Sequence, residues 1–325
     1  MISMDQIIFL PLKFIAYGMG VFLITLYLMY FETRLESFIH TKSSKGTLNL
    51  RGVFFPIALF INLFRVRLIF PEESYKFLYV LLPLFLGVAA FSLGMFIPFH
   101  STGFFSDSDY GILWIVAISY FLTYLMMIIG WASQTQYSLQ GVVRLFGHFI
   151  SSSLLFFLVI LTVVLWGGSM NLEHIIEEQK SVWFVLPLFP VFLIHIIVLL
   201  MRGRGAPVGM SESGIDLMGG YKSQYSGGLS VFLIIAEHLH FLLFSALTIV
   251  LFFGGWLPLW AGSSLSGASW FALKLALFLV CIIGIKSTLP NLRYDQIVSL
   301  NFKVFFPFIA LLFIVYCFLK AILNL

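Results

Sequence analysis

Charged residues are scarce in this chain. Asp, Glu, Lys and Arg together make up 10% of its 325 residues, whereas apolar residues make up 61%. Soluble domains carry roughly a quarter charged residues, so this chain lacks the polar side chains needed to cover a surface that faces water on all sides. Its mean hydropathy is +1.05. The composition excludes a soluble globular protein and predicts an integral membrane protein with a single polytopic domain over residues 1–325.

Cysteine and the common nucleotide-binding motifs are also nearly absent. The two cysteines, Cys281 and Cys317, lie in apolar runs without C-x-x-C spacing, which excludes an iron–sulfur cluster held by this chain alone. The sequence has no Walker loop and no G-x-G-x-x-G after a strand, so we expect no nucleotide site. No block of basic residues with interleaved aromatics suits nucleic acid, and we expect none as a partner.

Long apolar segments, by contrast, follow one another along the whole chain. A helix needs about 20 apolar residues to cross the hydrocarbon core of a bilayer. Eight segments qualify, near 7–30, 77–99, 110–130, 149–167, 182–201, 229–254, 268–287 and 304–324. A ninth stretch, 52–70, is interrupted by Asn62, Arg65 and Arg67 and predicts an amphipathic helix that lies in the membrane interface. We therefore predict an all-α protein of about eight transmembrane helices plus one interfacial helix.

The few basic residues are distributed unevenly between the loops. Fourteen of the 18 Lys and Arg residues fall in the first, third, fifth and seventh loops. The loops at 100–109 and 255–267 have none, and 168–181 has only Lys180. Basic loops face the cytoplasm, and eight spans are an even number. The pattern therefore predicts both termini on the non-cytoplasmic side.

The glycine-rich loop from Met201 to Gly228 carries Glu212 and Asp216 and leads into a span that holds Glu237. It resembles the loop of the H subunit of bacterial NADH–quinone oxidoreductase (respiratory complex I), which reads A-E-x-N-R-x-P-F-D-L-x-E-x-E-x-E-L-x-x-G-Y-x-x-E-Y. Further segments are similar to that family in the same order: Glu32 and Arg34, G-W-A-S-Q-T-Q-Y-S-L-Q-G-V-V-R at 130–144, S-M-N-L at 169–172, A-E at 236–237, F-F-G-G-W at 252–256 and L-P-x-x-R-Y-D-Q at 289–296. The resemblance covers essentially the whole chain.

Several acidic positions of the family are not acidic here. The Glu and Asn of A-E-x-N fall on Arg202 and Arg204, and the family's G-P-N-R-V-G is missing after His40. Other family acids fall on residues without charge: Ser153, Gly209, Gly214 and Gln224. Such a lining is shifted from negative toward neutral or positive, which raises the barrier to proton entry. The chain is a divergent member by this comparison.

The resemblance implies a subunit that joins the peripheral and membrane arms of a proton-translocating NADH–quinone oxidoreductase and lines the quinone chamber. It implies quinone as the substrate of the complex, other subunits and the lipid bilayer as partners, no cofactor held by this chain alone, and no catalysis by it alone. The expected location is the bacterial cell membrane or the mitochondrial inner membrane. Proton-path candidates are Glu237, Asp216 and Glu212, and candidates for the quinone chamber or for docking are Glu32, Arg34, Arg293 and Asp295.

Each of these assignments has a plainer alternative. Glu237 lies inside a span, where a charge costs at least about 2.5–3.5 kcal/mol, so a proton-path or structural polar role is favoured over a merely satisfied polar side chain. Glu212 and Asp216 could equally be solvated loop acids. His195, deep in the fifth span, predicts an inter-helix hydrogen bond rather than a proton relay. The E-H-x-H run at 237–240 does not converge on one helix face, so we expect no metal there.

Two further readings of the whole chain remain open at this point. A degenerate paralogue could keep the scaffold and docking surfaces of such a complex without normal quinone chemistry. An unrelated polytopic transporter is the third class, and the sequence shows no inverted repeat or pair of broken helices that would favour it.

Overall fold

The computed structural model describes residues 4–39, 55–100, 108–203, 222, 224–258, 266–290 and 292–323, with side chains of the first helix from Tyr17 onward. Within these ranges every regular element is a helix, which confirms the predicted all-α membrane fold. The helices are α1 (Met4–Ile39), α3 (Phe55–Arg65), α4 (Lys76–Leu93), α5 (Gly111–Ala132), α6 (Gln136–Gly167), α7 (Leu172–Glu178), α8 (Phe189–Arg202), α9 (Gly227–Phe252), α10 (Gly267–Thr288), α11 (Tyr294–Leu300) and α12 (Phe306–Leu323). A π-helical turn, Asn301–Phe305, joins α11 to α12.

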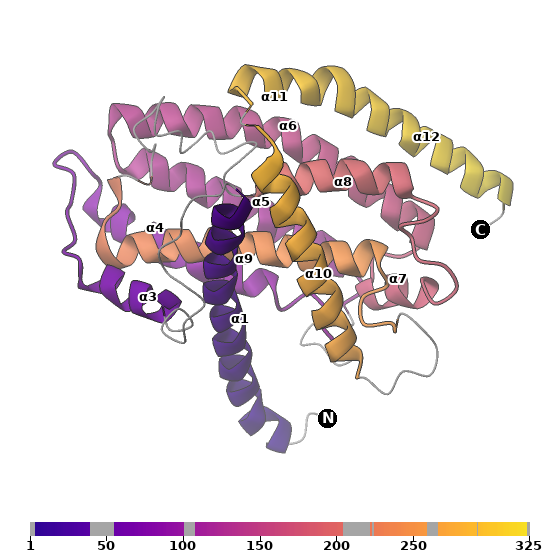
Figure 1. Cartoon of the computed structure of the whole chain (residues 1–325), viewed down its shortest axis with the longest axis horizontal. Helices are drawn as coiled ribbons and strands as arrows, with labels where there is room; N and C mark the ends of the chain where they lie inside the picture. The colour runs from indigo at the N-terminus through magenta and orange to yellow at the C-terminus, as the bar shows by residue number, and fades with distance from the viewer. Residues whose placement is uncertain are drawn as a thin grey trace.

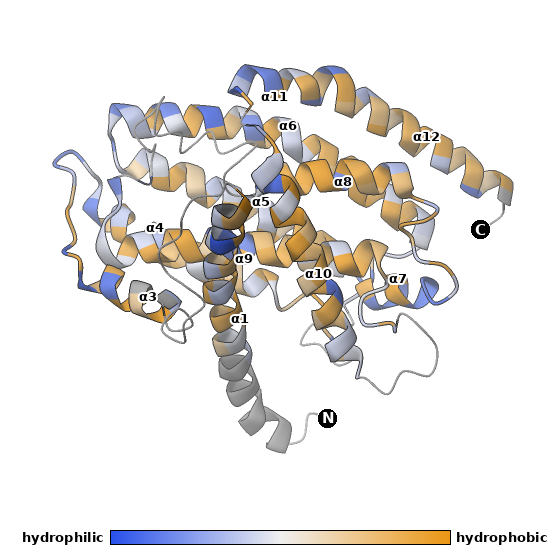
Figure 2. Cartoon of the chain, viewed as in Figure 1, coloured by the Kyte–Doolittle hydropathy of each residue, from blue (hydrophilic) through white to orange (hydrophobic). Residues whose placement is uncertain are grey.

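Helix α9 forms the centre of the bundle (Figure 1). It packs against α1, α3, α4, α7, α8 and α10, and from Leu239 to Phe252 every one of its residues is buried. A helix that is apolar all round has no face to present to water and is stable only when it is enclosed. The hydropathy colouring shows this apolar character along the bundle helices, with hydrophilic residues gathered toward the helix ends and over α11 (Figure 2).

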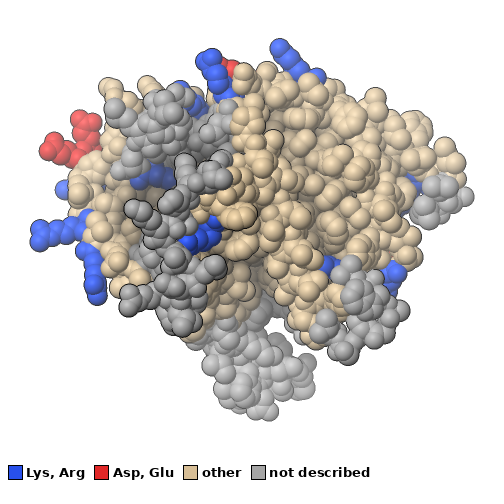
Figure 3. Space-filling view, viewed as in Figure 1, with Lys and Arg blue, Asp and Glu red and all other residues tan. Residues whose placement is uncertain are grey.

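The outer face of the molecule is largely uncharged. In the space-filling view, Lys, Arg, Asp and Glu appear mainly along the margins of a broad surface of other residues (Figure 3). Large apolar side chains are exposed on several helices, including Phe77 and Val88 on α4, Leu113 on α5 and Phe318 on α12. Lipid or other apolar helices are the environment that such a surface requires.

Six of the predicted spans correspond to helices that are long and apolar enough to cross a membrane, counted over the described residues. The other two correspond to α1, which has 36 residues, and α8, which has 14. At a rise of about 1.5 Å per residue, α8 covers only about 21 Å. The predicted span 182–201 was therefore wrong at its start. Residues 182–188 form turns, and Pro190 in the first turn of α8 marks where the helix begins, because proline needs no hydrogen-bond acceptor there.

Helix α6, helix α7 and the start of the last span also differ from the sequence prediction. Helix α6 begins at Gln136, well before the predicted 149, because hydropathy detects the apolar part of a helix and not a polar extension that carries Arg144 and His148. The last span is preceded by α11 and the π-helical turn as one nearly continuous helix. Helix α7 was not predicted at all, since seven residues are too few to produce a periodic pattern. The stretch predicted to lie in the interface contains α3, whose Arg65 is exposed.

Close backbone approaches hold the entry to α9 in place. Gly227 has φ +62°, and a Cβ atom there would lie 2.6 Å from the carbonyl oxygen of Val66. Only glycine satisfies both the left-handed conformation and this contact. Two tyrosines secure the same entry: Tyr79 and Tyr225 stack with ring centroids 4.1 Å apart, and the Tyr225 hydroxyl donates to the Ile129 carbonyl at 2.9 Å. Tyr225, the last tyrosine of the glycine-rich loop before α9, thus has a structural role.

Candidate functional site

A buried ion pair joins the first helix to the tenth. The Glu32 carboxylate, near the end of α1, accepts a hydrogen bond from the Lys286 ammonium on α10. The two residues are 6% and 3% exposed, so the pair is almost withdrawn from solvent. The Lys286 ammonium also lies 5.7 Å from the ring centroid of Phe241 on α9. Burial makes the pairing compulsory, because either charge alone would be poorly solvated.

His238 on α9 lies against the same carboxylate. Its Nδ1 lies 2.7 Å from the carbonyl oxygen of Ile234, which can only accept, so Nδ1 carries a hydrogen. Its Nε2 lies 3.4 Å from the second carboxylate oxygen of Glu32. The Glu32 carboxylate is therefore contacted by side chains from two other helices, Lys286 on α10 and His238 on α9.

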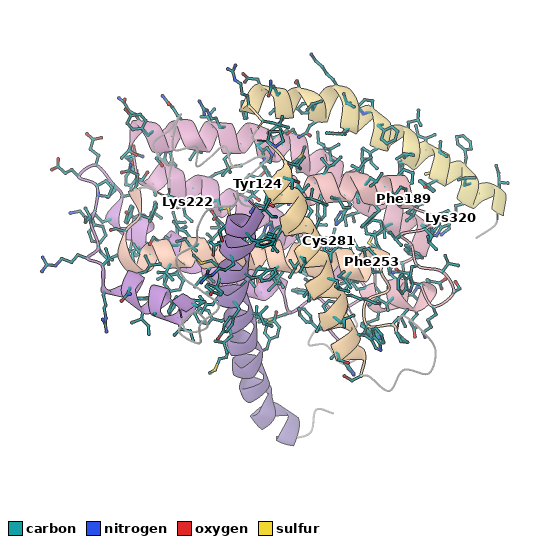
Figure 4. All side chains as sticks on the ribbon, viewed as in Figure 1. Tyr124, Phe189, Lys222, Phe253, Cys281 and Lys320 are labelled. Atoms are coloured by element: carbon teal, nitrogen blue, oxygen red, sulfur yellow. The ribbon has the colours of Figure 1, made fainter. Side chains whose placement is uncertain are left out.

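A second buried pair lies on the same helix. The carboxylate of Glu237 accepts a hydrogen bond from the ammonium of Lys222, which belongs to the segment just before α9. Their side chains are 10% and 13% exposed. Figure 4 shows Lys222 at one end of the bundle and Lys320, near the chain's C-terminus, at the other. Glu237 and His238 are neighbours in sequence but point to different sides of α9, so the two ion pairs lie on different sides of the same helix.

The structure separates the remaining predicted site residues from this cluster. Arg34 lies half-buried with its guanidinium carbon 5.0 Å from the ring centroid of Tyr30. Arg293 and Asp295 are exposed at the start of α11, where the Arg293 amide donates to the Gln296 side chain at 3.1 Å. Glu212 and Asp216 lie outside the described residues. Of the predicted candidates that are described, Glu32 and Glu237 are in buried ion pairs, each with its own lysine.

Sequence reasoning missed the partners of these two acids. Lys222 and Lys286 entered only as charges that indicate membrane orientation, and His238 only as a rejected metal ligand. The charges near the ends of the spans indicated that ion pairs could form there. No spacing rule, however, connects Glu32 with a lysine 254 residues away. Within the described residues, no group of three His, Cys, Asp or Glu side chains is placed to hold a metal ion.

Two other polar side chains inside the predicted spans have structural partners. His195 Nε2 lies 2.9 Å from the Thr248 hydroxyl, which confirms the predicted inter-helix hydrogen bond. Lys274 on α10 is 6% exposed and donates to the carbonyl oxygens of Phe253 and Leu257 at 2.7 Å and of Gly255 at 3.1 Å. Lys274 thus satisfies the backbone acceptors that follow α9.

An apolar groove runs along the side of the bundle beside the ion pairs. It has a volume of about 270 Å³, lies between α1, α3, α4 and α9, and is lined by aromatic and aliphatic side chains that include Phe22, Phe64 and Ile235. A neighbouring cavity of about 300 Å³ shares Phe22 and Phe91 with it. Ile235 and His238 are three positions apart on α9 and so lie on one side of that helix, whereas Glu237, two positions from Ile235, faces another side.

The structure is a bundle of apolar helices with carboxylates, lysines and a histidine buried between them. This arrangement defines the class of the protein, a polytopic membrane protein with charged side chains in its interior. Comparison with known proteins identifies the family. A family model described as NADH dehydrogenase matches residues 12–317. The chain is 33% identical over 285 residues to the H subunit of NADH-quinone oxidoreductase from Rhodospirillum centenum, covering 87% of this chain and 85% of that protein.

Two further relatives come from different lineages. The H subunit of the same enzyme from Rickettsia prowazekii is 34% identical over 305 residues, covering 92% of this chain and 90% of that protein. The NADH-ubiquinone oxidoreductase chain 1 of Metridium senile is 32% identical over 291 residues, covering 89% and 86%. The chain therefore belongs to the NADH dehydrogenase family of membrane subunits, and the resemblance found in its motifs is confirmed.

Proposed function

We propose that this chain is a membrane subunit of a proton-translocating NADH–quinone oxidoreductase, where it links the peripheral and membrane arms, lines the quinone chamber and forms the first part of a proton path. It catalyses nothing alone and relies on other subunits for the redox centres. It lies in a bacterial cell membrane or mitochondrial inner membrane, with both termini on the non-cytoplasmic side. The observation that carries the proposal is the burial of two carboxylates, Glu32 and Glu237, each paired with a lysine inside an apolar helical bundle.

The groove supports the quinone part of this proposal. A membrane quinone has a polar ring and a long apolar tail, so its site needs an apolar channel that ends at polar groups. The groove between α1, α3, α4 and α9 has the apolar lining, and Ile235 places it on the side of α9 that carries His238. The ring would then lie toward His238 and Glu32 and the tail among the phenylalanines.

A cluster of titratable side chains supports the proton-path part. Reduction of a quinone to a quinol takes two electrons and two protons, and the electrons come from the redox centres of partner subunits. The Glu32 carboxylate lies 3.4 Å from the His238 imidazole and is paired with Lys286, so groups that can accept or donate a proton lie side by side between α1, α9 and α10. The side chains of Glu237 and Lys222 are about one-tenth exposed, so the second pair has the limited access that proton exchange requires.

Substitution of Glu237 in the assembled complex tests this role. We expect Glu237→Gln to leave assembly intact and to lower quinone-dependent turnover and proton pumping at least tenfold. This minimum is smaller than the factor of about 10²–10⁴ that a general acid or base contributes to a rate. Glu177→Gln is the matched control, since Glu177 is an exposed acid on α7 paired only with Lys180. Unchanged turnover and pumping in Glu237→Gln would remove this residue from the mechanism.

A second candidate function is a scaffold subunit without normal quinone chemistry. It is favoured by the charge balance, because both buried carboxylates are already neutralised by lysines and Arg202 replaces a family acid. The scaffold role predicts that Glu32→Gln with Lys286→Met leaves electron transfer in the complex unchanged. Inhibitor-sensitive quinone reduction that is lost in this double variant would exclude the scaffold role.

A further inference from the structure

One more charged residue is buried in the bundle besides the two ion pairs and Lys274, and no described carboxylate is paired with it. Arg202 is the last residue of α8, and all three nitrogens of its guanidinium are buried without a hydrogen-bond partner. Three rings enclose it: the guanidinium carbon lies 4.7 Å from the ring centroid of Phe156, 5.2 Å from that of Phe244 and 5.4 Å from that of Tyr120. Ring faces attract a cation, but they cannot accept the hydrogen bonds of its five N–H groups.

No described carboxylate is available to balance this charge. The Glu32 and Glu237 carboxylates are each already paired with a lysine. Glu173, whose Oε1 is also buried, belongs to α7, which is not among the helices that supply the rings around Arg202. The Tyr120 hydroxyl donates its hydrogen to the Ser153 carbonyl at 3.0 Å. Counted over the described residues, the interior between α5, α6, α8 and α9 therefore carries one excess positive charge. A desolvated charge of this kind is stable only with a partner of opposite sign and with its donors satisfied.

Two histidines supply further unmatched groups around the same cation. Nε2 of His148 on α6 and Nε2 of His240 on α9 are both buried without partners, and both rings lie within the electrostatic reach of Arg202. His240 stacks at 4.5 Å on Phe244, one of the rings that enclose the arginine. An imidazole protonated at Nε2 is a hydrogen-bond donor, so these two side chains can add donors to those of Arg202.

His195 is nearby but is not a donor to the same position. The Thr248 hydroxyl gives its hydrogen to the Phe244 carbonyl at 2.9 Å, so its oxygen accepts from His195 Nε2 at 2.9 Å. In the neutral ring the remaining nitrogen, Nδ1, then has a lone pair and repels an anion. The donor set therefore consists of Arg202, His148 and His240.

We propose that Arg202, His148 and His240 form a buried binding site for one small monovalent anion of the halide class. The anion supplies the missing negative charge and accepts from the unsatisfied N–H groups. The rings around the guanidinium pack directly on one another, with the centroids of Phe156 and Phe244 5.1 Å apart, so a counter-ion beside the guanidinium must be small. The proposal does not depend on quinone binding.

The test counts the halide in the purified complex. The complex is prepared in bromide instead of chloride, washed into gluconate, and the bromide content per complex is measured by X-ray fluorescence. We expect the Arg202→Met complex to hold one bromide fewer than the wild type. Arg202→Met removes an unpaired buried charge from an apolar setting, so it is expected to fold and assemble. The control is Arg65→Met, which removes an exposed arginine on α3 and should leave the count unchanged.

A further variant keeps the test decisive if Arg202→Met does not assemble. His240→Phe retains the ring and removes one donor, and it should also lower the count by one bromide. Equal bromide in the wild type and in these variants would overturn the proposal. So would a structure of the bromide-loaded complex in which only water contacts Arg202.

Discussion

The Glu32–Lys286 pair allows one prediction to be worked out in detail. Lys286→Met removes the ammonium and leaves the Glu32 carboxylate 6% exposed, with His238 as its nearest remaining partner at 3.4 Å. Breaking a buried pair by removing one member costs about 3–5 kcal/mol. Because the polar His238 ring remains beside the carboxylate, we expect the lower end, a loss of about 3 kcal/mol of stability.

The double variant is expected to behave differently from either single variant. Glu32→Gln together with Lys286→Met removes both charges and leaves groups of similar size, which is close to neutral for a buried pair. The coupling energy of the double-mutant cycle should therefore be at least about 2 kcal/mol. An exposed pair gives less than about 1 kcal/mol, and Glu177→Gln with Lys180→Met on α7 serves as that control.

The assay follows release of the chain from the purified complex as a denaturing detergent is added. The midpoints for wild type, both single variants and the double variant give the four corners of the cycle, provided that all four transitions have the same slope. A double variant as unstable as Lys286→Met would refute the reasoning, because the loss would then come from packing and not from an unpaired charge. A single variant within about 0.5 kcal/mol of wild type would show that water reaches Glu32.

Three further predictions follow from local geometry and from loop charge. Gln134 has φ +56° in the turn between α5 and α6, so Gln134→Gly should stabilise the protein by about 0.5–1 kcal/mol while Gln134→Ala has little effect. Gln179 is 1% exposed and forms hydrogen bonds of 2.9 Å with the Val250 carbonyl and with the Gly254 amide. Gln179→Leu should therefore lower the stability by about 2–4 kcal/mol, because these two backbone groups lose their partner. Gln140→Leu, at an exposed position, should change the stability very little, and both variants are measured by the detergent midpoint. A cysteine at Lys45 should react with an impermeant thiol reagent only from the cytoplasm and one at Glu178 only from outside, and external labelling at Lys45 would reverse the orientation.

Much of the architecture could be predicted from the sequence because a bilayer imposes a single requirement. Every span needs about 20 apolar residues with its backbone hydrogen bonds satisfied within a helix. The apolar runs of α4, α5, α9 and α10 meet that requirement without help from other elements, and the residues at which they begin were predicted to within a few positions. The start of α8 could not be predicted in this way, because residues 182–188 are as apolar as the helix but are bent into turns that bond the end of α9.

The candidate site, unlike the spans, could be predicted only in small part from the sequence. The sequence by itself determined that Glu237 is an acid inside a span and that Arg202 stands where relatives have an acid, since both statements concern chemistry at one position. Only the tertiary structure decided that Glu237 is neutralised by Lys222, that Glu32 meets Lys286 and His238, and that Arg202 has rings around it and no carboxylate among the described residues. The free energy of a buried charge depends on the groups within a few ångströms of it. Those groups come from helices far apart in the chain, and the packing of the helices brings them together.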